Sequence, residues 1–257
     1  MILSRHNPRI REIRALTGSS RERADAGLLV VEGLRCVDTA LRCGAELVRL
    51  YLAEPSRESE ALARVERAGA QTEADVERVD REVLGWASSV QSSTDCVAVV
   101  RRPARSLGVL GADVNRALVL EHVGDPGNVG SAIRSAVAAG VDCVILAGRC
   151  ADWSNPKVVR GSAGTVFALP VVESRSVRDA LATLALTGIG ASSEGGTSVY
   201  EARLPSRGAL VLGSEARGLS RDARNACDSL VTIPMVRDVE SLNVAAAAAV
   251  CLFLMTR

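Results

Sequence analysis

A glycine-spaced polar loop near the middle of the chain contains the residue types that bind a ligand through the backbone. It reads Gly124-Asp-Pro-Gly-Asn-Val-Gly-Ser-Ala-Ile-Arg134 and follows a short apolar run. Its three glycines permit a tight turn, and such a loop at the start of a helix could cradle a phosphate. Arg134 lies on the same helical face as Gly130, from where its guanidinium could reach the loop at Asn128. The spacing is not Gly-x-Gly-x-x-Gly, and no acidic residue clearly ends the next strand, which disfavours a dinucleotide site.

A basic pair follows in the segment Ser154-Asn-Pro-Lys-Val-Val-Arg-Gly-Ser-Ala-Gly164. The segment predicts a helix N-cap with proline at the first helical position. Lys157 and Arg160 then share one helical face and could hold two phosphates of an RNA backbone, while Gly161 and Gly164 would let another group approach closely. The same spacing is equally typical of a solvated basic face.

Two further segments combine the end of a strand with polar residues. Leu212-Gly-Ser-Glu-Ala-Arg-Gly-Leu219 leaves a strand, so Gly213 would expose backbone groups to a nucleoside and Glu215 would lie at the carboxyl edge of a sheet. Ile233-Pro-Met235 leaves another strand, and Ser241 is predicted to cap the last helix. Taken alone, these are an ordinary strand-to-helix turn and an ordinary cap.

The first hundred residues predict a small α/β domain. Strands are expected at 27–33, 47–52 and 96–100, with helices near 34–43, 57–68 and 80–87. Arginines, a proline and two glycines at 101–113 predict a linker. We therefore expect one domain over residues 1–100 and a second over 114–257.

Five short apolar runs in the second domain predict buried parallel strands, at 117–122, 142–147, 189–192, 209–213 and 230–233. Helices are expected at 129–139, 155–162, 176–186, 220–226 and 241–255. This alternation predicts a doubly wound α/β domain whose ligand lies at the carboxyl ends of the strands. The last helix has almost no polar face, so either its own domain encloses it or a homodimer covers it.

The composition is that of a well-packed globular protein, since 257 residues with 47% hydrophobic content can fill two cores. A net charge of +1 excludes a strongly basic protein, so any nucleic-acid contact must come from local clusters. Lys157 is the only lysine, and the other basic residues are arginines, whose planar fork suits phosphate. Aromatic residues are only 2% of the chain, which disfavours single-strand binding by stacking.

The seven cysteines are scattered and never spaced as Cys-x-x-Cys, and only His6 and His122 could help to build a metal site. We therefore expect reduced thiols, no metal and a cytoplasmic location. The first ten residues lack the apolar core of a secretion signal. The longest apolar run, 244–255, is shorter than the ~20 residues that span a membrane, so no membrane partner is expected.

Taken together, these segments resemble the three motifs of the SpoU-type (TrmH-type) RNA 2′-O-ribose methyltransferases of the SPOUT superfamily. The motifs correspond to residues 125–134, 212–219 and 233–235, the last with Ser241-Leu-Asn-Val-Ala245. The resemblance implies an enzyme that depends on S-adenosylmethionine and dimerises through its C-terminal domain. It also implies a C-terminal chain threaded into a trefoil knot, a rare exception to the usual absence of knots.

The resemblance implies roles for individual residues as well. The family's polar catalytic set is matched by Asn128, Arg134, Glu215, Ser241 and Asn243. The loops that hold adenosine, largely through backbone groups, are matched by Leu212, Gly213, Ser214, Ile233, Pro234, Met235, Ser241, Leu242, Asn243, Val244 and Ala245. The same resemblance favours RNA contacts for Lys157 and Arg160.

Two positions depart from the family pattern. Arg237 stands where many members carry glycine, and Ala216 stands where glycine is frequent after the motif glutamate. Neither departure removes a proposed catalytic side chain. Arg237 could add a contact to RNA or cofactor, or it could narrow the pocket.

The N-terminal domain resembles, more weakly, the substrate-binding extension of ribosomal RNA members, which has a ribosomal-protein-like RNA-binding fold. The resemblance lies in Asn7-Pro-Arg-Ile-Arg11, Arg21-Glu-Arg23 and Leu29-Val-Val-Glu-Gly33. Residues 1–35 contain seven arginines against four acidic residues, a local net charge of +3 that suits a phosphate surface. RNA contacts are therefore predicted for Arg9, Arg11, Arg21 and Arg23.

The implied reaction is in-line attack of a ribose 2′-oxygen on the methyl group of the cofactor. Because a guanidinium normally stays protonated, we expect Arg134 to stabilise the developing oxyanion rather than to act as a base. The additional N-terminal domain favours ribosomal RNA of the large subunit as substrate. The alternatives are a tRNA 2′-O-methyltransferase and, from another class, a non-catalytic RNA-binding or ribosome-assembly factor.

Overall fold

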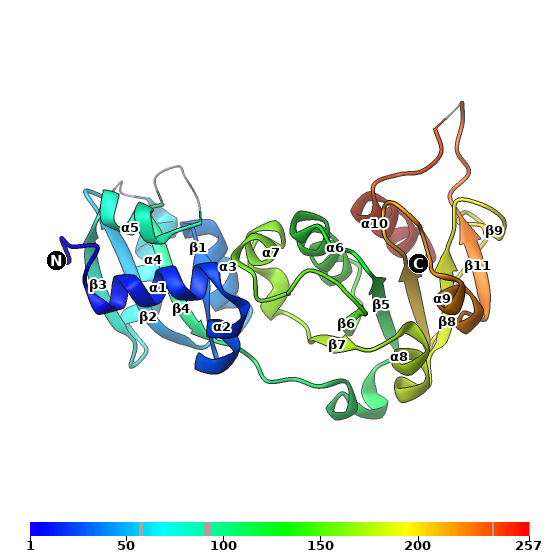
Figure 1. The fold of residues 1–257 in the computed structure, drawn as a ribbon, viewed down its shortest axis with the longest axis horizontal. Helices are drawn as coiled ribbons and strands as arrows, with labels where there is room; N and C mark the ends of the chain where they lie inside the picture. Colours follow the sequence, from blue (N-terminus) through cyan, green and yellow to red (C-terminus); the bar gives the residue numbers. More distant parts are fainter. Residues whose placement is uncertain (57–58, 90–93, 238, 257) are drawn as a thin grey trace. The chain divides into compact units, whose positions relative to one another are not determined.

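The computed structural model describes residues 1–56, 59–89, 94–237 and 239–256, and the chain forms two compact units (Figure 1). Unit 1 comprises Met1–Ala104 together with Asp152–Ala168, and unit 2 comprises Arg105–Ala151 with Leu169–Arg257. The chain therefore leaves unit 2 after Ala151, completes unit 1 and returns to unit 2 at Leu169. The assignment of separate functions to residues 1–100 and 114–257 stays a prediction.

Unit 1 is built on a four-stranded sheet in the order β1-β4-β2-β3. β1 and β2 both pair antiparallel with β4, and β3 extends the sheet parallel to β2. The strands are β1 (Leu28–Glu32), β2 (Leu47–Glu54), β3 (Asp75–Asp80) and β4 (Cys96–Arg101). The helices are α1 (Pro8–Gly18), α2 (Ser20–Ala26), α3 (Leu34–Arg42), α4 (Glu60–Ala70), α5 (Arg81–Ala87) and α7 (Pro156–Gly161), with a 3-10 turn at η3 (Thr165–Phe167).

Most of the predicted elements of unit 1 are confirmed to within a few residues, although positions 57 and 58 of one predicted helix lie outside the described residues. The sequence reasoning missed α1, α2 and β3. β3 reads Asp-Val-Glu-Arg-Val-Asp, and only Val79 of these six residues is buried. As an edge strand it carries charges on much of its surface, so it lacks the apolar run that identified the other strands.

The core of unit 1 includes an apolar stripe on α1. Ile10, Ile13 and Leu16 follow helical spacing, and all three are buried against the sheet residues Tyr51 and Val97. Asn7 caps this helix by accepting a hydrogen bond from the backbone of Arg9, with Pro8 at the first helical position. The remaining positions of α1 face outward and carry its arginines and glutamate.

Unit 2 contains a seven-stranded parallel sheet in the order β7-β6-β5-β10-β8-β11-β9. The chain enters the sheet at β5, moves outward through β6 to β7, and then crosses to β8 on the other side of β10. This reversal of direction confirms the predicted doubly wound fold and creates a switch point between β5 and β10. The strands are β5 (Arg116–Glu121), β6 (Cys143–Ala147), β7 (Val171–Ser174), β8 (Thr187–Ala191), β9 (Thr197–Ser198), β10 (Gly208–Leu212) and β11 (Ser229–Thr232).

Helices connect these strands, together with two 3-10 turns that precede β5. They are η1 (Leu107–Val109), η2 (Gly111–Asp113), α6 (Pro126–Ala138), α8 (Val177–Leu184), α9 (Arg221–Ala226) and α10 (Val244–Met255). The five predicted strands and the helices predicted at 129–139, 176–186 and 220–226 are confirmed, whereas the helix predicted at 155–162 is α7 and belongs to unit 1, and β7 and β9 were not predicted. β7 and β9 form the two edges of the sheet and are short, so each buries few apolar residues.

The last helix begins later than predicted, and its cap is a different residue. α10 starts at Val244, and Asn243 is its N-cap, with the side-chain oxygen accepting from the backbone N–H groups of Ala245 and Ala246. The prediction that Ser241 caps this helix is wrong, because the chain reaches helical geometry only after Asn243. α10 packs on α6 and on β10, while Phe253 on its outer side is 43% exposed.

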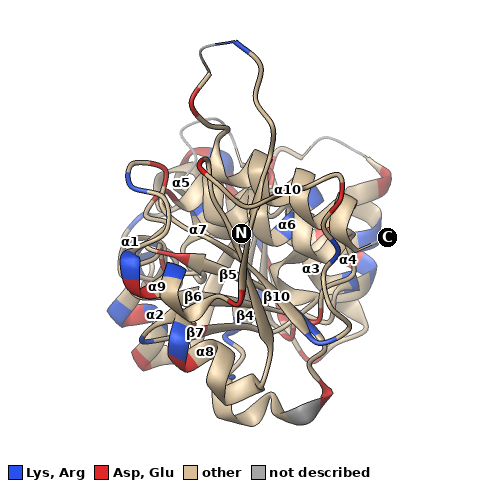
Figure 2. Ribbon diagram, turned by 90° about the vertical axis from the view of Figure 1, so that its right-hand side faces the viewer, with Lys and Arg blue, Asp and Glu red and all other residues tan. Residues whose placement is uncertain are grey.

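Basic and acidic residues lie side by side along the helices rather than gathering on one of them (Figure 2). All seven cysteines are free thiols. Burial raises the pKa of Cys36 and Cys143 to about 12 and that of Cys150, Cys227 and Cys251 to about 11, so these thiols stay protonated at neutral pH. Within the described ranges, none of the helices has the length and apolar character needed to cross a bilayer.

Candidate active site

The two polar loops that follow β5 and β10 emerge at the same edge of the unit 2 sheet. β5 and β10 are hydrogen-bonded neighbours in parallel register, from Arg116 beside Gly208 to Leu120 beside Leu212. Their carboxyl ends therefore meet at the switch point of the doubly wound sheet, where such folds bind ligands. Asn128 lies in the first turn of α6, directly after the loop that follows β5, and Glu215 lies in the loop that follows β10.

The local sequence orders the loop after β5. Asp125 is the N-cap of α6 and accepts a 2.8 Å hydrogen bond from the backbone N–H of Asn128, while Pro126 occupies the first helical position. Asn128 is thereby fixed in the first turn, and its half-buried side chain is free to bond outside the helix.

Three of the predicted catalytic residues form one hydrogen-bonded chain. The amide nitrogen of Asn128 donates to Oε1 of Glu215 at 2.5 Å, and the amide nitrogen of Asn243 donates to Oδ1 of Asn128 at 2.9 Å. These two hydrogen bonds join the first turn of α6 to the loop after β10 and to the start of α10. Since Oδ1 of Asn243 also caps α10, the position of Asn128 is coupled to that of the helix.

The other two predicted catalytic residues lie apart from this chain of bonds. Arg134 is exposed on α6, and Ser241 is exposed in the segment that leads to α10. Ser241 lines the cavity described below, whereas Arg134 is absent from its lining. Both therefore have the exposure that contact with a substrate requires.

A cavity of about 420 Å³ opens beside the loop after β10. Its lining combines apolar side chains with hydroxyls, carboxylates and the guanidinium groups of Arg217 and Arg224, as in pockets for small polar ligands. Of the predicted cofactor residues, it is lined by Leu212, Gly213, Ser214, Ile233, Met235, Ser241, Leu242 and Val244, while Pro234, Asn243 and Ala245 are not part of the lining. The sequence reasoning missed the contribution of the segment after β8, from which Ser192, Ser193 and Glu194 line the cavity.

The loop after β10 folds back closely on the strand from which it leaves. The backbone N–H of Gly218 donates to the carbonyl of Ser214 at 2.8 Å, and Gly218 has a φ of 61°. A Cβ atom on Gly213 would lie 2.0 Å from the carbonyl carbon and oxygen of Gly218. Gly213 is therefore required for this close return of the backbone, which forms one wall of the cavity.

The far end of the same loop is held by a buried carboxylate that the sequence reasoning missed. Glu121, at the end of β5, accepts hydrogen bonds from the backbone N–H of Ser220 at 2.9 Å and from its hydroxyl at 2.6 Å. Only 6% of Glu121 is exposed. An acidic residue at the end of a buried strand is the signal that could have identified it, since a carboxylate in that position needs donors nearby.

Arg237 has a φ of 64°, the left-handed region that favours glycine. Its side chain is exposed, and it is not among the residues that line the cavity. The structure therefore gives no support to the suggestion that Arg237 narrows the pocket. Ala216, the other departure, is exposed in the loop after β10 and lines the cavity.

The arginines predicted to contact RNA in unit 1 have different environments. Arg9 pairs with Asp75 and Glu77, Arg21 pairs with Asp25 on an exposed face, and Arg11 bonds to the ring of His6. Arg23 is only 3% exposed and donates to Asp152 at 2.5 Å, to Ser154 at 3.0 Å and to the carbonyl of Leu16 at 2.8 Å. These contacts give Arg23 a structural role in joining the segment 152–168 to the rest of unit 1.

The basic pair on α7 belongs to unit 1. Asn155 caps this helix with Pro156 at its first position, as predicted. Lys157 is exposed, whereas the Arg160 guanidinium is paired with Glu32 at 3.0 Å. The close approach at Gly164 is made by the backbone of α3, since a Cβ there would lie 2.4 Å from the carbonyl oxygen of Cys36.

An aromatic residue on the surface of unit 1 was also missed. The guanidinium of Arg14 lies 4.3 Å from the ring centre of Trp86, and that of Arg5 lies 5.9 Å from it. Such a stack is a feature of RNA-contacting surfaces, although it also occurs on other exposed helices.

Among the described residues, no group of three or more histidine, cysteine, aspartate or glutamate side chains is arranged to hold a metal ion. The polar cluster at the switch point is formed by the side-chain amides of Asn128 and Asn243 and the carboxylate of Glu215.

The chain matches two family models. One, described as the SpoU rRNA Methylase family, covers residues 115–253, and the other, described as the MRM3-like substrate binding domain, covers residues 7–98. A 23S rRNA (uridine(2479)-2′-O)-methyltransferase of Streptomyces viridochromogenes is 32% identical over 98% of this chain and 90% of its own length. A 23S rRNA (guanosine-2′-O-)-methyltransferase RlmB of Xanthomonas axonopodis pv. citri is 35% identical over 87% of this chain and 94% of its own length.

Solved structures show the same similarity. The SpoU methyltransferase AviRb of Streptomyces viridochromogenes, in complex with AdoMet, aligns with a TM-score of 0.86 at 28% identity, covering 98% of this chain and 97% of its own. An AdoMet-bound rRNA methyltransferase of Sinorhizobium meliloti aligns with a TM-score of 0.84 at 25% identity, covering 98% and 95%.

Proposed function

This chain belongs to the SpoU rRNA methylase family, and on that basis we propose that it transfers the methyl group of S-adenosylmethionine to a ribose 2′-oxygen of large-subunit ribosomal RNA. The observation that carries the proposal is the pair of hydrogen bonds that joins Glu215 to Asn128 and Asn128 to Asn243, beside the cavity at the switch point. It places polar groups able to orient a hydroxyl next to a site large enough for a nucleoside.

The residues around the cavity fit S-adenosylmethionine. The volume of about 420 Å³ lies within the range of small-molecule sites, roughly 300–1,000 Å³. Leu212, Ile233 and Leu242 offer apolar surface to an adenine ring, and the tight loop at Gly213 brings backbone groups to the wall. When bound there, the cofactor supplies an electrophilic methyl group.

The chain's own residues then position the nucleophile and stabilise its charge. Asn128, Glu215 and Asn243 hold one another in fixed orientations, which reduces the reorganisation needed when a ribose hydroxyl arrives. We assign to Arg134 the electrostatic stabilisation of the oxyanion that develops at the 2′-oxygen as the hydroxyl proton passes to a phosphate of the RNA backbone. Its exposure on α6 is consistent with approach by an RNA strand.

Unit 1 supplies the proposed RNA-binding surface. Its match to a substrate binding domain and the 23S rRNA substrates named for both relatives favour ribosomal RNA over tRNA. Lys157, Arg160 and the exposed arginines Arg11 and Arg21 are the proposed contacts, and the cytoplasm is the compartment that this substrate implies. Arg9 is a further proposed contact, and RNA would have to compete with Asp75 and Glu77 for its guanidinium.

We further propose that the C-terminal chain forms the trefoil knot of the family and that α10 lies in a homodimer interface. The outer side of α10 carries the exposed Phe253 and no charged residue. Apolar surface of this kind is usually covered in solution. Light scattering coupled to gel filtration tests the dimer, and a monomeric mass would contradict it.

Methyl transfer to purified RNA tests the function directly. Labelled S-adenosylmethionine is supplied with unmodified 23S rRNA or with total tRNA, and wild type is compared with Arg134→Ala. We expect label on 23S rRNA that disappears in the variant. Label on tRNA alone would overturn the substrate, and cofactor binding without label on any RNA or ribosomal particle would favour a non-catalytic factor.

A further inference from the structure

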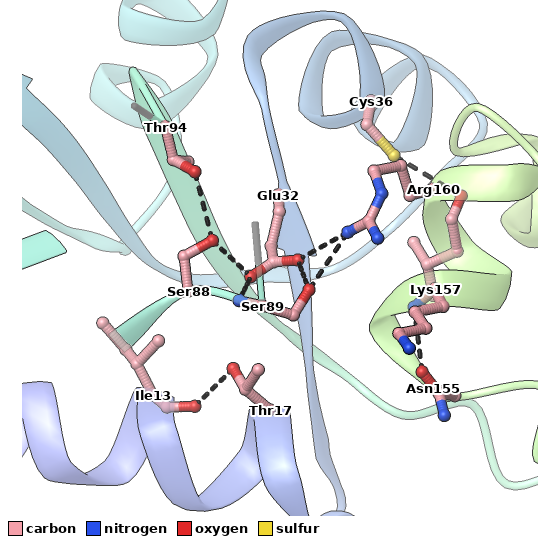
Figure 3. A network of polar contacts seen from close by, with 11 residues as sticks. Ile13, Thr17, Glu32, Cys36, Ser88, Ser89, Thr94, Asn155, Lys157 and Arg160 are labelled. Atoms are coloured by element: carbon pink, nitrogen blue, oxygen red, sulfur yellow. Dashed lines mark hydrogen bonds and ion pairs between the residues drawn. The ribbon is translucent and has the colours of Figure 1, made fainter. Parts of the chain in front are cut away.

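Glu32 ends β1 as a carboxylate whose side chain is 0% exposed. The hydroxyl of Ser88 and the backbone N–H of Ser89 donate to its Oε1 at 2.7 Å and 2.6 Å. The hydroxyl of Ser89 and Nη1 of Arg160 donate to Oε2, the latter at 3.0 Å (Figure 3). The serines are neutral donors, so Arg160 is the group in this cluster that balances the charge.

Arg160 is only partly used by this cluster. Its bonds in the cluster, to Glu32 and to the hydroxyl of Ser89 at 3.0 Å, are both made by Nη1. Its side chain remains 40% exposed, and Nε and Nη2 are not needed for these two bonds. In Figure 3 the side chains of Arg160 and Lys157 extend from the same side of α7.

The helix that carries these two cations is itself fixed within unit 1. The thiol of Cys36 donates to the carbonyl of Val159 at 3.5 Å, and the backbone of α3 packs directly on Gly164. The Arg23–Asp152 pair holds the start of the segment. With α7 fixed at both ends, the remaining freedom lies in the long basic side chains.

We infer that Glu32 is a positioning residue, which holds the Arg160 guanidinium so that α7 presents Arg160 and Lys157 together to two phosphates of an RNA backbone. This inference rests on the proposed function of RNA methylation. Burying the Glu32 carboxylate costs free energy that its ion pair with the partly exposed Arg160 only offsets, and the best-attested use of such pairs is to fix one geometry. An arginine held before binding also avoids the entropic cost of being ordered by the ligand.

The test uses a substitution for which a positioning role and the change in net charge predict opposite effects on RNA affinity. Glu32→Gln removes one negative charge from unit 1 and so raises its net charge by one, which by simple electrostatics tightens RNA binding. If Glu32 positions Arg160, the variant instead binds more weakly, because the new amide donor faces Nη1 and releases the guanidinium. Glu46→Gln is the matched control, since it removes the same charge from the exposed Glu46–Arg101 pair of the same unit.

RNA binding is measured on the full chain with a fragment of 23S rRNA at several salt concentrations, and methyl transfer is measured separately. We expect Glu32→Gln to raise the Kd for RNA by about ten-fold. The plot of the logarithm of the association constant against the logarithm of salt concentration should become less steep by about 1, as for one lost phosphate contact. KM for RNA should rise with kcat and cofactor binding unchanged, while Glu46→Gln stays at the wild-type Kd or below it. Unchanged or tighter binding by a folded Glu32→Gln would overturn the inference.

A second variant decides the matter if Glu32→Gln fails to fold. Ser89→Ala removes the hydroxyl that bridges Glu32 and Arg160 and leaves both charges paired, so it should weaken RNA binding in the same direction. A folded Ser89→Ala with the wild-type Kd and salt slope would then overturn the inference. Because binding is read without methyl transfer, absence of methylation in the wild type would contradict the proposed function and leave this test intact.

Discussion

Asn243 donates its side-chain amide to Oδ1 of Asn128 at 2.9 Å, across 115 positions of sequence. The same Asn243 side chain caps α10 through its oxygen. One amide group therefore serves a helix terminus with one atom and the candidate active site with the other.

Substitutions of Asn243 should separate these two tasks. Asn243→Asp keeps the capping oxygen but loses the donor to Asn128, so we expect near-wild-type stability with methyl transfer reduced about 100-fold. Asn243→Ala loses both, and its free energy of unfolding should fall by about 1 kcal/mol in addition. Activity assays and thermal unfolding measure the two effects. Full activity in Asn243→Asp would show that the hydrogen bond donated by Asn243 to Asn128 is not needed for methyl transfer.

Arg134 is expected to act on the rate constant rather than on cofactor binding. Arg134→Ala should lower kcat by about 10²–10³-fold. Arg134→Lys should retain part of the activity, because lysine keeps the positive charge but lacks the paired N–H donors of the planar guanidinium. The Kd for S-adenosylmethionine should stay unchanged in both. Arg178→Ala, at an exposed position on α8, is the control. Near-wild-type activity in Arg134→Ala would exclude an essential role.

Gly213→Ala should damage the cofactor site. The added Cβ would lie 2.0 Å from the backbone of Gly218, so the loop must move away from β10. We expect the Kd for S-adenosylmethionine, measured by calorimetry, to rise by at least roughly ten-fold, a penalty typical of forced backbone shifts. Gly124→Ala is the matched control, because a Cβ there meets no atom within 4 Å. Equal affinity for S-adenosylmethionine in the two variants would contradict the assignment of the loop at Gly213 as a wall of the cofactor site.

The Arg23–Asp152 pair predicts a dependence of stability on acid. Burial, the largest influence on Asp152, raises its pKa, but hydrogen bonds from Arg23 and Ser154 together outweigh it and leave the pKa lowered. A carboxyl with a lowered pKa in the folded state contributes stability that is complete above its unfolded pKa, about 3.9, and is lost as the pH falls through the folded value.

Asp152→Asn should therefore lower the free energy of unfolding at neutral pH by about 3 kcal/mol, because it leaves a buried guanidinium without its counter-charge. The loss should shrink as the pH falls below about 3.9, the unfolded pKa, because the wild type then progressively loses the pair as well. Asp25→Asn, which breaks the exposed pair with Arg21, serves as control and should change little. Chemical unfolding followed at several pH values measures both, and parallel curves for Asp152→Asn and wild type would contradict the prediction.

The sequence predicted those elements whose signal is a run of apolar residues. β5, β10 and β11 are such runs, and the motifs that follow them could be placed at the carboxyl edge of a sheet before the strand order was known. β3 was missed because an edge strand can be mostly charged, and α1 was missed because only Ile10, Ile13 and Leu16 mark its buried stripe.

The contacts between distant residues could not be predicted in this way. Glu32 and Glu121 are each the last residue of a buried strand, yet nothing local shows that their partners are Arg160 and Ser220, since pairing depends on how the chain folds back. Ser241 and Asn243 are both capping residue types, and the choice between them depends on where packing of α10 begins. The predicted roles of the site residues stay predictions until the variants are measured.

The discontinuity of unit 1 has a consequence during synthesis. Chains leave the ribosome from the N-terminus, at about 5–20 residues per second. Residues 1–104 emerge first, but the segment that completes their unit, Asp152–Ala168, follows only after β5, α6 and β6 have been made. Until then Arg23 and Glu32 lack the partners Asp152 and Arg160. The nascent N-terminal part therefore carries the charges of Arg23 and Glu32 without their ionic partners until residues 152–168 have been made.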